Sequence, residues 1–129
     1  MNPLWPLLGS VFLICIYGHM RCKLDFFDPL STKLGIWDLD GWSVAHLVLF
    51  FVVGRAYPAE LPLLFAYGAA WEIIEHLLGK SRPSWLGGWA NCEENKNAEY
   101  NTGWWFGRIS DLVVNGIGMV LGWMSLRRF

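Results

Sequence analysis

The chain has 129 residues, of which 54% are hydrophobic and only 16% are charged, and its formal net charge is −1. So few charges would not cover the outside of a soluble domain of this length, which favours a small integral-membrane protein. The near-neutral balance argues against a nucleic-acid partner, which normally requires a basic patch. The sequence has no repeat or low-complexity tract, so we expect residues 1–129 to form a single membrane domain.

The first apolar run covers residues 4–20 and is at the lower length limit for a membrane-spanning helix. A cleaved signal peptide is the competing interpretation. It would need basic residues before the run and small residues at a cleavage site after it. Residues 1–3 contain no Lys or Arg, and residues 17–20 make a poor cleavage site, so we expect a retained helix.

Residues 21–41 alternate charged side chains with aromatic and aliphatic ones. The segment is too charged to span a membrane, and Pro29 interrupts any long helix. Such a composition is typical of a segment that lies on the membrane interface or folds back onto helix ends.

Two helices are expected next, over residues 42–56 and 59–79. The run Asp40-Gly41-Trp42-Ser43 resembles a helix start, and Gly79 is placed to end the second of these helices. Only a short turn separates the two, so we expect them to form an antiparallel hairpin.

Residues 80–102 form a second polar connection, rich in Asn and Trp, and a last helix is expected over residues 103–126. The predicted fold class is therefore all-α: a polytopic membrane bundle of about four helices. Its two long interfacial loops lie on one side and both chain ends on the other. The distribution of Lys and Arg does not decide the orientation.

The polar residues of the predicted helices fall at one depth. At 1.5 Å per residue, they all lie within about 5–15 Å of the long-loop face. Charged groups are costly at membrane depth, so their gathering predicts a polar site reachable from that face. The residues are His46, Glu72, Glu75, His76, Arg108, Asp111 and Asn115.

Helical spacing also supports convergence. Glu72 and His76 are four residues apart and share a helix face. Arg108, Asp111 and Asn115 follow one stripe of the last helix, which Gly118 and Gly122 continue. Small residues allow a close neighbour, so this stripe should face protein.

Two chemistries suit these residue types: binding of a divalent cation, and general acid–base catalysis on a lipid or lipid-linked headgroup. The candidate metal ligands are His46, Glu72, His76 and Asp111. The candidate catalytic residues are Glu72, Glu75, His76 and Asp111. Arg108 and Asn115 are candidates for substrate binding, with Arg108 suited to a phosphate.

Two alternatives for the polar groups stay open. The polar groups could pair only with one another and fix the packing, as in a non-catalytic subunit of a larger membrane complex or a homo-oligomer. They could line an ion or proton path, although few polar groups continue into the other half of the bundle. Separately, Cys22 and Cys92 could form a disulfide.

Several of these residues resemble a known family. The pattern Asp38…His46…Phe50…Gly54, Gly68…Glu72…Glu75 and Arg108-Ile109-Ser110-Asp111…Asn115…Gly118…Gly122 is similar to VanZ-like small integral-membrane proteins. The block from Trp71 to Glu75 also resembles a related membrane family with a Trp-Glu-Ile-x-Glu-Asn motif, where this chain has His76 in place of Asn. The resemblance covers residues 38–126 and implies a bundle of four or five membrane helices without defining a reaction.

Overall fold

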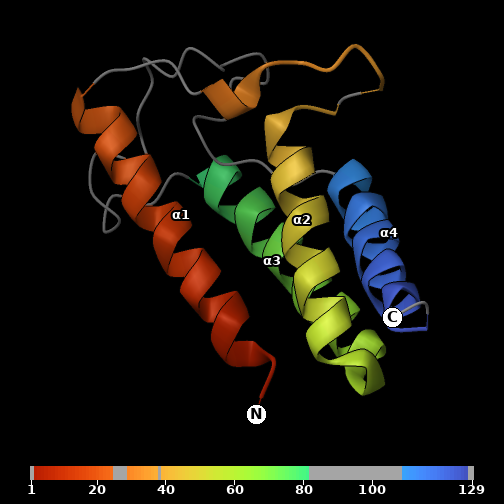
Figure 1. Cartoon of the computed structure of the whole chain (residues 1–129). Helices are drawn as coiled ribbons and strands as arrows, with labels where there is room; N and C mark the ends of the chain where they lie inside the picture. Colours follow the sequence, from red (N-terminus) through yellow and green to blue (C-terminus); the bar gives the residue numbers. More distant parts are fainter. Residues whose placement is uncertain (1, 25–28, 38, 82–108, 128–129) are drawn as a thin grey trace.

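The computed structural model describes residues 2–24, 29–37, 39–81 and 109–127, and this part of the chain is all-helical (Figure 1). The all-α prediction is therefore confirmed for the described residues. In chain order the elements are α1 (Leu4–Leu24), the 3₁₀ helix η1 (Pro29–Ser31), α2 (Gly41–Ala56), the 3₁₀ helix η2 (Pro58–Glu60), α3 (Leu61–Ser81) and α4 (Ile109–Ser125).

The four long helices alternate in direction. α1 ends, α2 begins, α3 ends and α4 begins at the upper end of the bundle in Figure 1, and α1 begins and α4 ends at the lower end. This is the expected arrangement. α1 continues to Leu24, beyond the predicted end at residue 20, and residues 103–108 of the predicted last helix lie outside the described residues.

The start of α2 is fixed by a reciprocal capping box, as its sequence indicates. The Asp40 carboxylate accepts a hydrogen bond from the Ser43 backbone N–H at 3.2 Å, and the Ser43 hydroxyl accepts one from the Asp40 N–H at 3.2 Å. These bonds satisfy backbone donors that the first turn of a helix leaves unpaired. The cap holds the upper end of α2, where His46 follows one turn later.

α2 and α4 pack along a seam of glycines, and theirs is the most extensive helix contact in the described structure. A Cβ atom at Gly118 would lie 2.6 Å from the Leu47 carbonyl oxygen, and one at Gly54 would lie 2.5 Å from the Met119 carbonyl oxygen. A Cβ at Gly122 would likewise collide with backbone of α2. The two backbones are therefore too close for any side chain at these positions, which confirms that the stripe of α4 faces protein.

α3 does not form the expected closely packed hairpin with α2. The chain direction changes by 108° between the two helices, whereas an antiparallel hairpin turns it by about 180°. α4 packs closely against α2 along the glycine seam. α3 in turn contacts α4 more extensively than it contacts α2. The apolar core consists of Leu7, Phe50, Val53, Leu64 and Met119.

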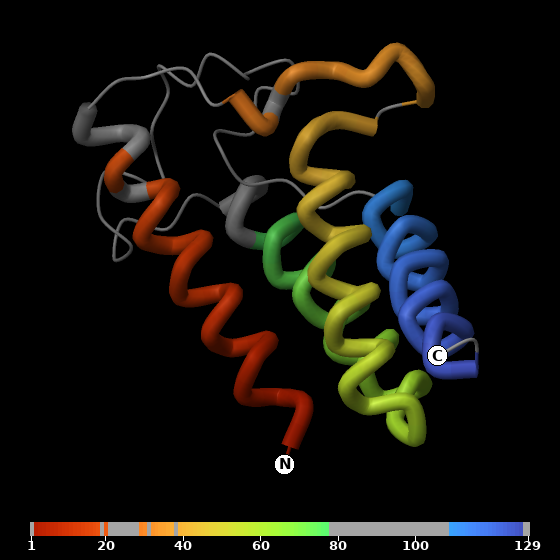
Figure 2. Tube along the Cα trace, in the orientation of Figure 1, coloured from red at the N-terminus to blue at the C-terminus, as the bar shows by residue number. Residues whose placement is uncertain are grey.

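α1 contacts the other helices less than they contact one another (Figure 2). Its clearest anchor is an edge-to-face contact between Tyr17 and Trp42 of α2, with ring centroids 5.5 Å apart. Leu7 adds a second contact as its one core residue. α1 is therefore held at separate points rather than along its length.

The membrane setting stays a prediction. Within the described residues, no single helix is both long and apolar enough to cross a membrane, whereas residues 41–56 and 58–77 reach that length and apolarity together. The apolar parts of α1 and α4, Leu4–Gly18 and Ile109–Ser125, are shorter.

Candidate functional site

Three potential metal ligands from three helices meet near the upper end of the bundle. His46 comes from α2, Glu72 from α3 and Asp111 from α4, and one ligand atom from each lies within 4.8 Å of the others. The His46 Nε2 atom lies 3.9 Å from Glu72 Oε1 and 3.9 Å from Asp111 Oδ2. Because each ligand sits on a different helix, the cluster forms only when the bundle is assembled.

Asn115 fixes the orientation of the His46 ring. Its side-chain oxygen lies 2.8 Å from His46 Nδ1. An amide oxygen only accepts hydrogen bonds, so the ring donates its Nδ1–H to Asn115. In a neutral imidazole the lone pair then lies on Nε2, the atom that faces both carboxylates. Metal-binding histidines typically show this arrangement, with the second ring nitrogen donating to a carbonyl or carboxylate oxygen.

Asp111 is held by the capping box of α2. The Ser43 hydroxyl lies 3.4 Å from Asp111 Oδ1 and 3.4 Å from Asp40 Oδ1. A single residue thus caps α2, on which His46 sits, and contacts a carboxylate of the cluster. The start of α2 and the position of Asp111 on α4 are therefore coupled.

The cluster is buried. The exposed fractions are 5% for Glu72, 3% for Asp111 and 1% for Asn115. Removing a carboxylate from water costs several kcal/mol unless charge and hydrogen bonds compensate it. The burial of two carboxylates beside one imidazole therefore favours a compensating positive charge, such as a bound cation.

Gly68 of α3 makes room for this arrangement. A Cβ atom there would lie 3.0 Å from Asn115 Nδ2 and 3.0 Å from Phe50 Cζ. Asn115 Nδ2 is buried and has no hydrogen-bond partner among the described residues. A side chain at position 68 would therefore press on Asn115, the residue that orients His46.

The ligand atoms of the cluster lie farther apart than they would around a bound zinc ion. Ligand atoms around tetrahedral zinc lie about 3.3 Å apart, given bonds of about 2.0–2.1 Å. The separations of 3.9 Å from Nε2 would need to shorten by about 0.6 Å, and the Glu72 and Asp111 ligand atoms lie within 4.8 Å of each other. Cations with longer bonds to oxygen would need less adjustment.

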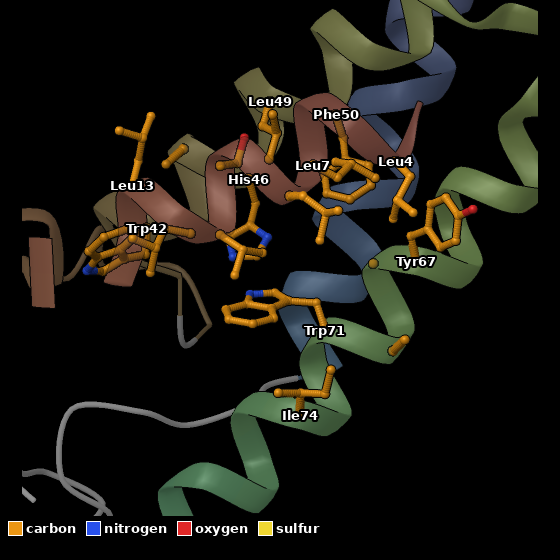
Figure 3. Close-up of a pocket in the computed structure, with 17 residues that line it drawn as sticks. Leu4, Leu7, Leu13, Trp42, His46, Leu49, Phe50, Tyr67, Trp71 and Ile74 are labelled. Carbon is orange, nitrogen blue, oxygen red and sulfur yellow. The ribbon is translucent and has the colours of Figure 1, made fainter. Parts of the chain in front are cut away.

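An apolar cavity of about 390 Å³ adjoins the cluster between α1, α2 and α3 (Figure 3). His46 is part of its wall, and in the close-up Trp71 lies beside the His46 ring. Leu4, Leu7 and Tyr67 lie toward one end of the cavity, and Trp42 and Leu13 toward the other. His46 therefore borders both the charged cluster and an apolar space.

Four of the predicted site residues come together: His46, Glu72, Asp111 and Asn115. His76 is exposed and is not part of the cluster, so the structure does not bring this predicted metal ligand to the site. Glu75 is half-buried and also outside the cluster.

Other expectations fall outside the described part of the chain. These are Arg108 and Asp38, the connection of residues 82–102, and Cys92 with its possible bridge to Cys22.

The roles of Ser43 and Gly68 at the site were not predicted from sequence. The signal for Ser43 was present, because a Ser three residues after a capping Asp commonly closes a capping box. Its second contact, with Asp111, depends on how α2 and α4 pack and has no local signal. The cavity also had no signal, since its wall consists of residues that would equally fill a core.

No family model matches the chain, and no match was found among curated proteins or among solved structures. The resemblance to VanZ-like proteins therefore stays a prediction, and the function must be argued from the site itself.

Proposed function

We propose that this is a small membrane protein that binds a divalent cation at His46, Glu72 and Asp111 and uses it on the headgroup of a membrane lipid. The observation that carries the proposal is the convergence of these three ligands from three helices, with Asn115 orienting the imidazole. With a neutral imidazole, the ligands carry two negative charges, which a divalent cation matches.

The surface of the helices supports a membrane setting. Large apolar side chains are exposed on the outer faces of all four long helices, at a density that a soluble monomer rarely shows. They include Trp5 and Phe12 of α1, Val48 and Val52 of α2, Ile73 of α3, and Val113 and Ile117 of α4. A lipid environment, as expected for a VanZ-like protein, accounts for this exposure.

The ligand set suits a cation that accepts both nitrogen and oxygen, such as Zn²⁺ or Mn²⁺. Three protein ligands leave coordination positions open, as in catalytic rather than purely structural zinc sites. A cation held this way could polarise a phosphate or carbonyl oxygen of a bound headgroup. Glu72 or Asp111 would alternatively serve as the proton carrier if the site works without metal.

Metal binding by the purified protein tests the proposal. We expect one Zn²⁺ or Mn²⁺ per chain by equilibrium dialysis and elemental analysis, and loss of this binding in Glu72→Gln, which keeps the shape and removes the charge. Glu60→Gln at the lower end of the bundle is the matched control and should bind normally. Absence of stoichiometric metal in the folded wild-type protein would contradict the proposal.

A packing role is the second candidate, and the position of His46 Nε2 favours it. An imidazolium at equal distances of 3.9 Å from two carboxylates would bridge α3 and α4 without any metal. In that case the cluster serves a non-catalytic subunit. Glu72→Gln would then lower the thermal stability of the metal-free protein, whereas the metal-site proposal predicts that added cation stabilises the wild type alone.

A further inference from the structure

The cavity beside the cluster is bounded by helices that are fixed elsewhere. α2 and α3 are held through their contacts with α4, while α1 is held mainly through Tyr17 and Leu7. The cavity lies between these anchors and is partly open to the surface.

The wall of the cavity is apolar except near one point. Among the lining residues, His46 is the one member of the His46–Glu72–Asp111 cluster. The remainder are aliphatic, aromatic or small, with hydroxyl groups on Ser10 and Tyr67. The Ser10 hydroxyl donates a hydrogen bond to the Pro6 carbonyl oxygen. Water has few partners in such a space, which suits hydrocarbon better.

The dimensions of the cavity suit a hydrocarbon chain. The α1 side of the wall extends from Leu4 to Ile14, about 15 Å along the helix. Its volume of about 390 Å³ lies within the range of pockets that hold small organic ligands.

We propose that this cavity binds one hydrocarbon chain of an anionic membrane lipid, with the lipid headgroup at the His46–Glu72–Asp111 cluster. The headgroup part rests on the proposed cation, because an anion would otherwise be repelled by the two carboxylates. His46 then serves both parts of the ligand: its Nε2 faces the cation, and the ring borders the chain. The cavity would select for a lipid, and the cation would place its phosphate or other anionic oxygen.

Photo-crosslinking in nanodiscs of phosphatidylcholine tests this proposal. The probes are trace amounts of a phospholipid and of an isoprenyl phosphate, each with a diazirine in its hydrocarbon chain. Lipids that merely surround the protein give labelling that excess unlabelled lipid dilutes in proportion. A chain in the cavity gives saturable labelling of peptides covering residues 4–14 or 67–74. The chain comes from the lipid class whose probe gives saturable labelling that the same unlabelled lipid suppresses.

Cavity-filling variants give the decisive comparison. Ala70→Phe projects into the cavity, and Ala66→Phe is the same change on an exposed position of α3 outside the lining. We expect saturable labelling to fall about tenfold or more in Ala70→Phe and to stay unchanged in Ala66→Phe. Ala45→Phe fills the cavity from α2 and replaces Ala70→Phe if that variant does not fold.

The outcomes separate this proposal from the proposed cation site. Equal saturable labelling in Ala70→Phe and Ala66→Phe, or no saturable labelling at all, overturns the cavity proposal even if the protein binds metal normally. Saturable labelling that is unaffected by chelation and by His46→Ala overturns the placement of the headgroup while leaving the chain in the cavity. Absence of metal binding by the wild-type protein, together with chelator-insensitive labelling, counts against both the cation site and the headgroup placement and leaves the chain in the cavity.

Discussion

The two sides of α2 are packed in opposite ways. Toward α4 its backbone lies so close that glycines at three positions leave no room for a Cβ atom. Toward α1 the same helix borders a cavity of about 390 Å³. The close packing against α4 fixes the positions of the backbone and of the ligands that it carries. The side toward α1 leaves space for a bound molecule.

The candidate site lies where these two regions meet. Asp111 and Asn115 belong to the tightly packed side, on the same stripe of α4 as Gly118. His46 faces this stripe with its nitrogens and also borders the cavity. The proposed binding of a lipid headgroup and chain requires such an arrangement, in which fixed ligands lie beside an open apolar cavity.

The largest effect is expected at the glycine seam. Gly118→Leu would place a side chain against the Leu47 carbonyl oxygen, where even a Cβ lies only 2.6 Å away. Backbone cannot move aside cheaply, so we expect loss of the folded state, measured by thermal unfolding in detergent. Gly116→Leu is the control, because its Cβ meets only Phe65 at 3.7 Å. Equal unfolding of both variants would show that the seam is not special.

Removal of a carboxylate should come next in size. Asp111→Asn keeps the shape and the Ser43 contact but removes a charged ligand. We expect cation affinity to fall about 100-fold or more while the helical content by circular dichroism is retained. An affinity that is unchanged in Asp111→Asn would contradict a cation site at this cluster.

A smaller effect is expected from crowding the residue that orients His46. Gly68→Ala places a Cβ 3.0 Å from Asn115 Nδ2 and from Phe50 Cζ. Ala favours a helix over Gly by about 1 kcal/mol, which offsets the local crowding. We therefore expect little change in stability but about a tenfold weaker cation affinity, measured by equilibrium dialysis. Gly9→Ala, where a Cβ meets nothing within 4 Å, is the control.

The sequence was sufficient for most of the tightly packed side. Helix starts, the capping role of Asp40 and the buried stripe of α4 follow from local chemistry and from the spacing of small and polar residues. Asp111, Asn115, Gly118 and Gly122 are all buried, as one stripe predicts. Local rules succeed here because helix geometry alone decides which of these residues share a face.

His76 shows where spacing misleads. Each step of four residues advances about 40° around a helix, so the buried series Leu64, Gly68, Glu72 drifts steadily around α3. By the next step, His76 lies about 80° from the centre of that series, and it is exposed. Glu75 lies only about 20° from the centre, in agreement with its half-buried position. Sharing a face with one buried residue therefore does not ensure burial.

The loosely packed side could not be predicted from sequence. The expected hairpin of α2 and α3 relied on the short turn between them, but the 108° change of direction depends on how both helices meet α4. The cavity depends on the same angle, because it lies between α1, α2 and α3. Such features depend on how the helices are placed relative to one another, and no single segment of the sequence encodes that placement.

The smallest effect is expected at the lower end of the seam, where polar contacts flank the close backbone approach at Gly122. The Arg55 Nη1 donates a hydrogen bond of 2.6 Å to the Ser125 hydroxyl, which in turn donates to the Gly122 carbonyl oxygen at 2.6 Å. Ser125→Ala removes both bonds, but water can replace them at this exposed position. We expect the free energy of unfolding to change by less than about 0.5 kcal/mol, against complete unfolding for Gly118→Leu a few turns away. A loss from Ser125→Ala comparable to that from the glycine variant would mean that polar bridging, rather than backbone proximity, holds α2 to α4.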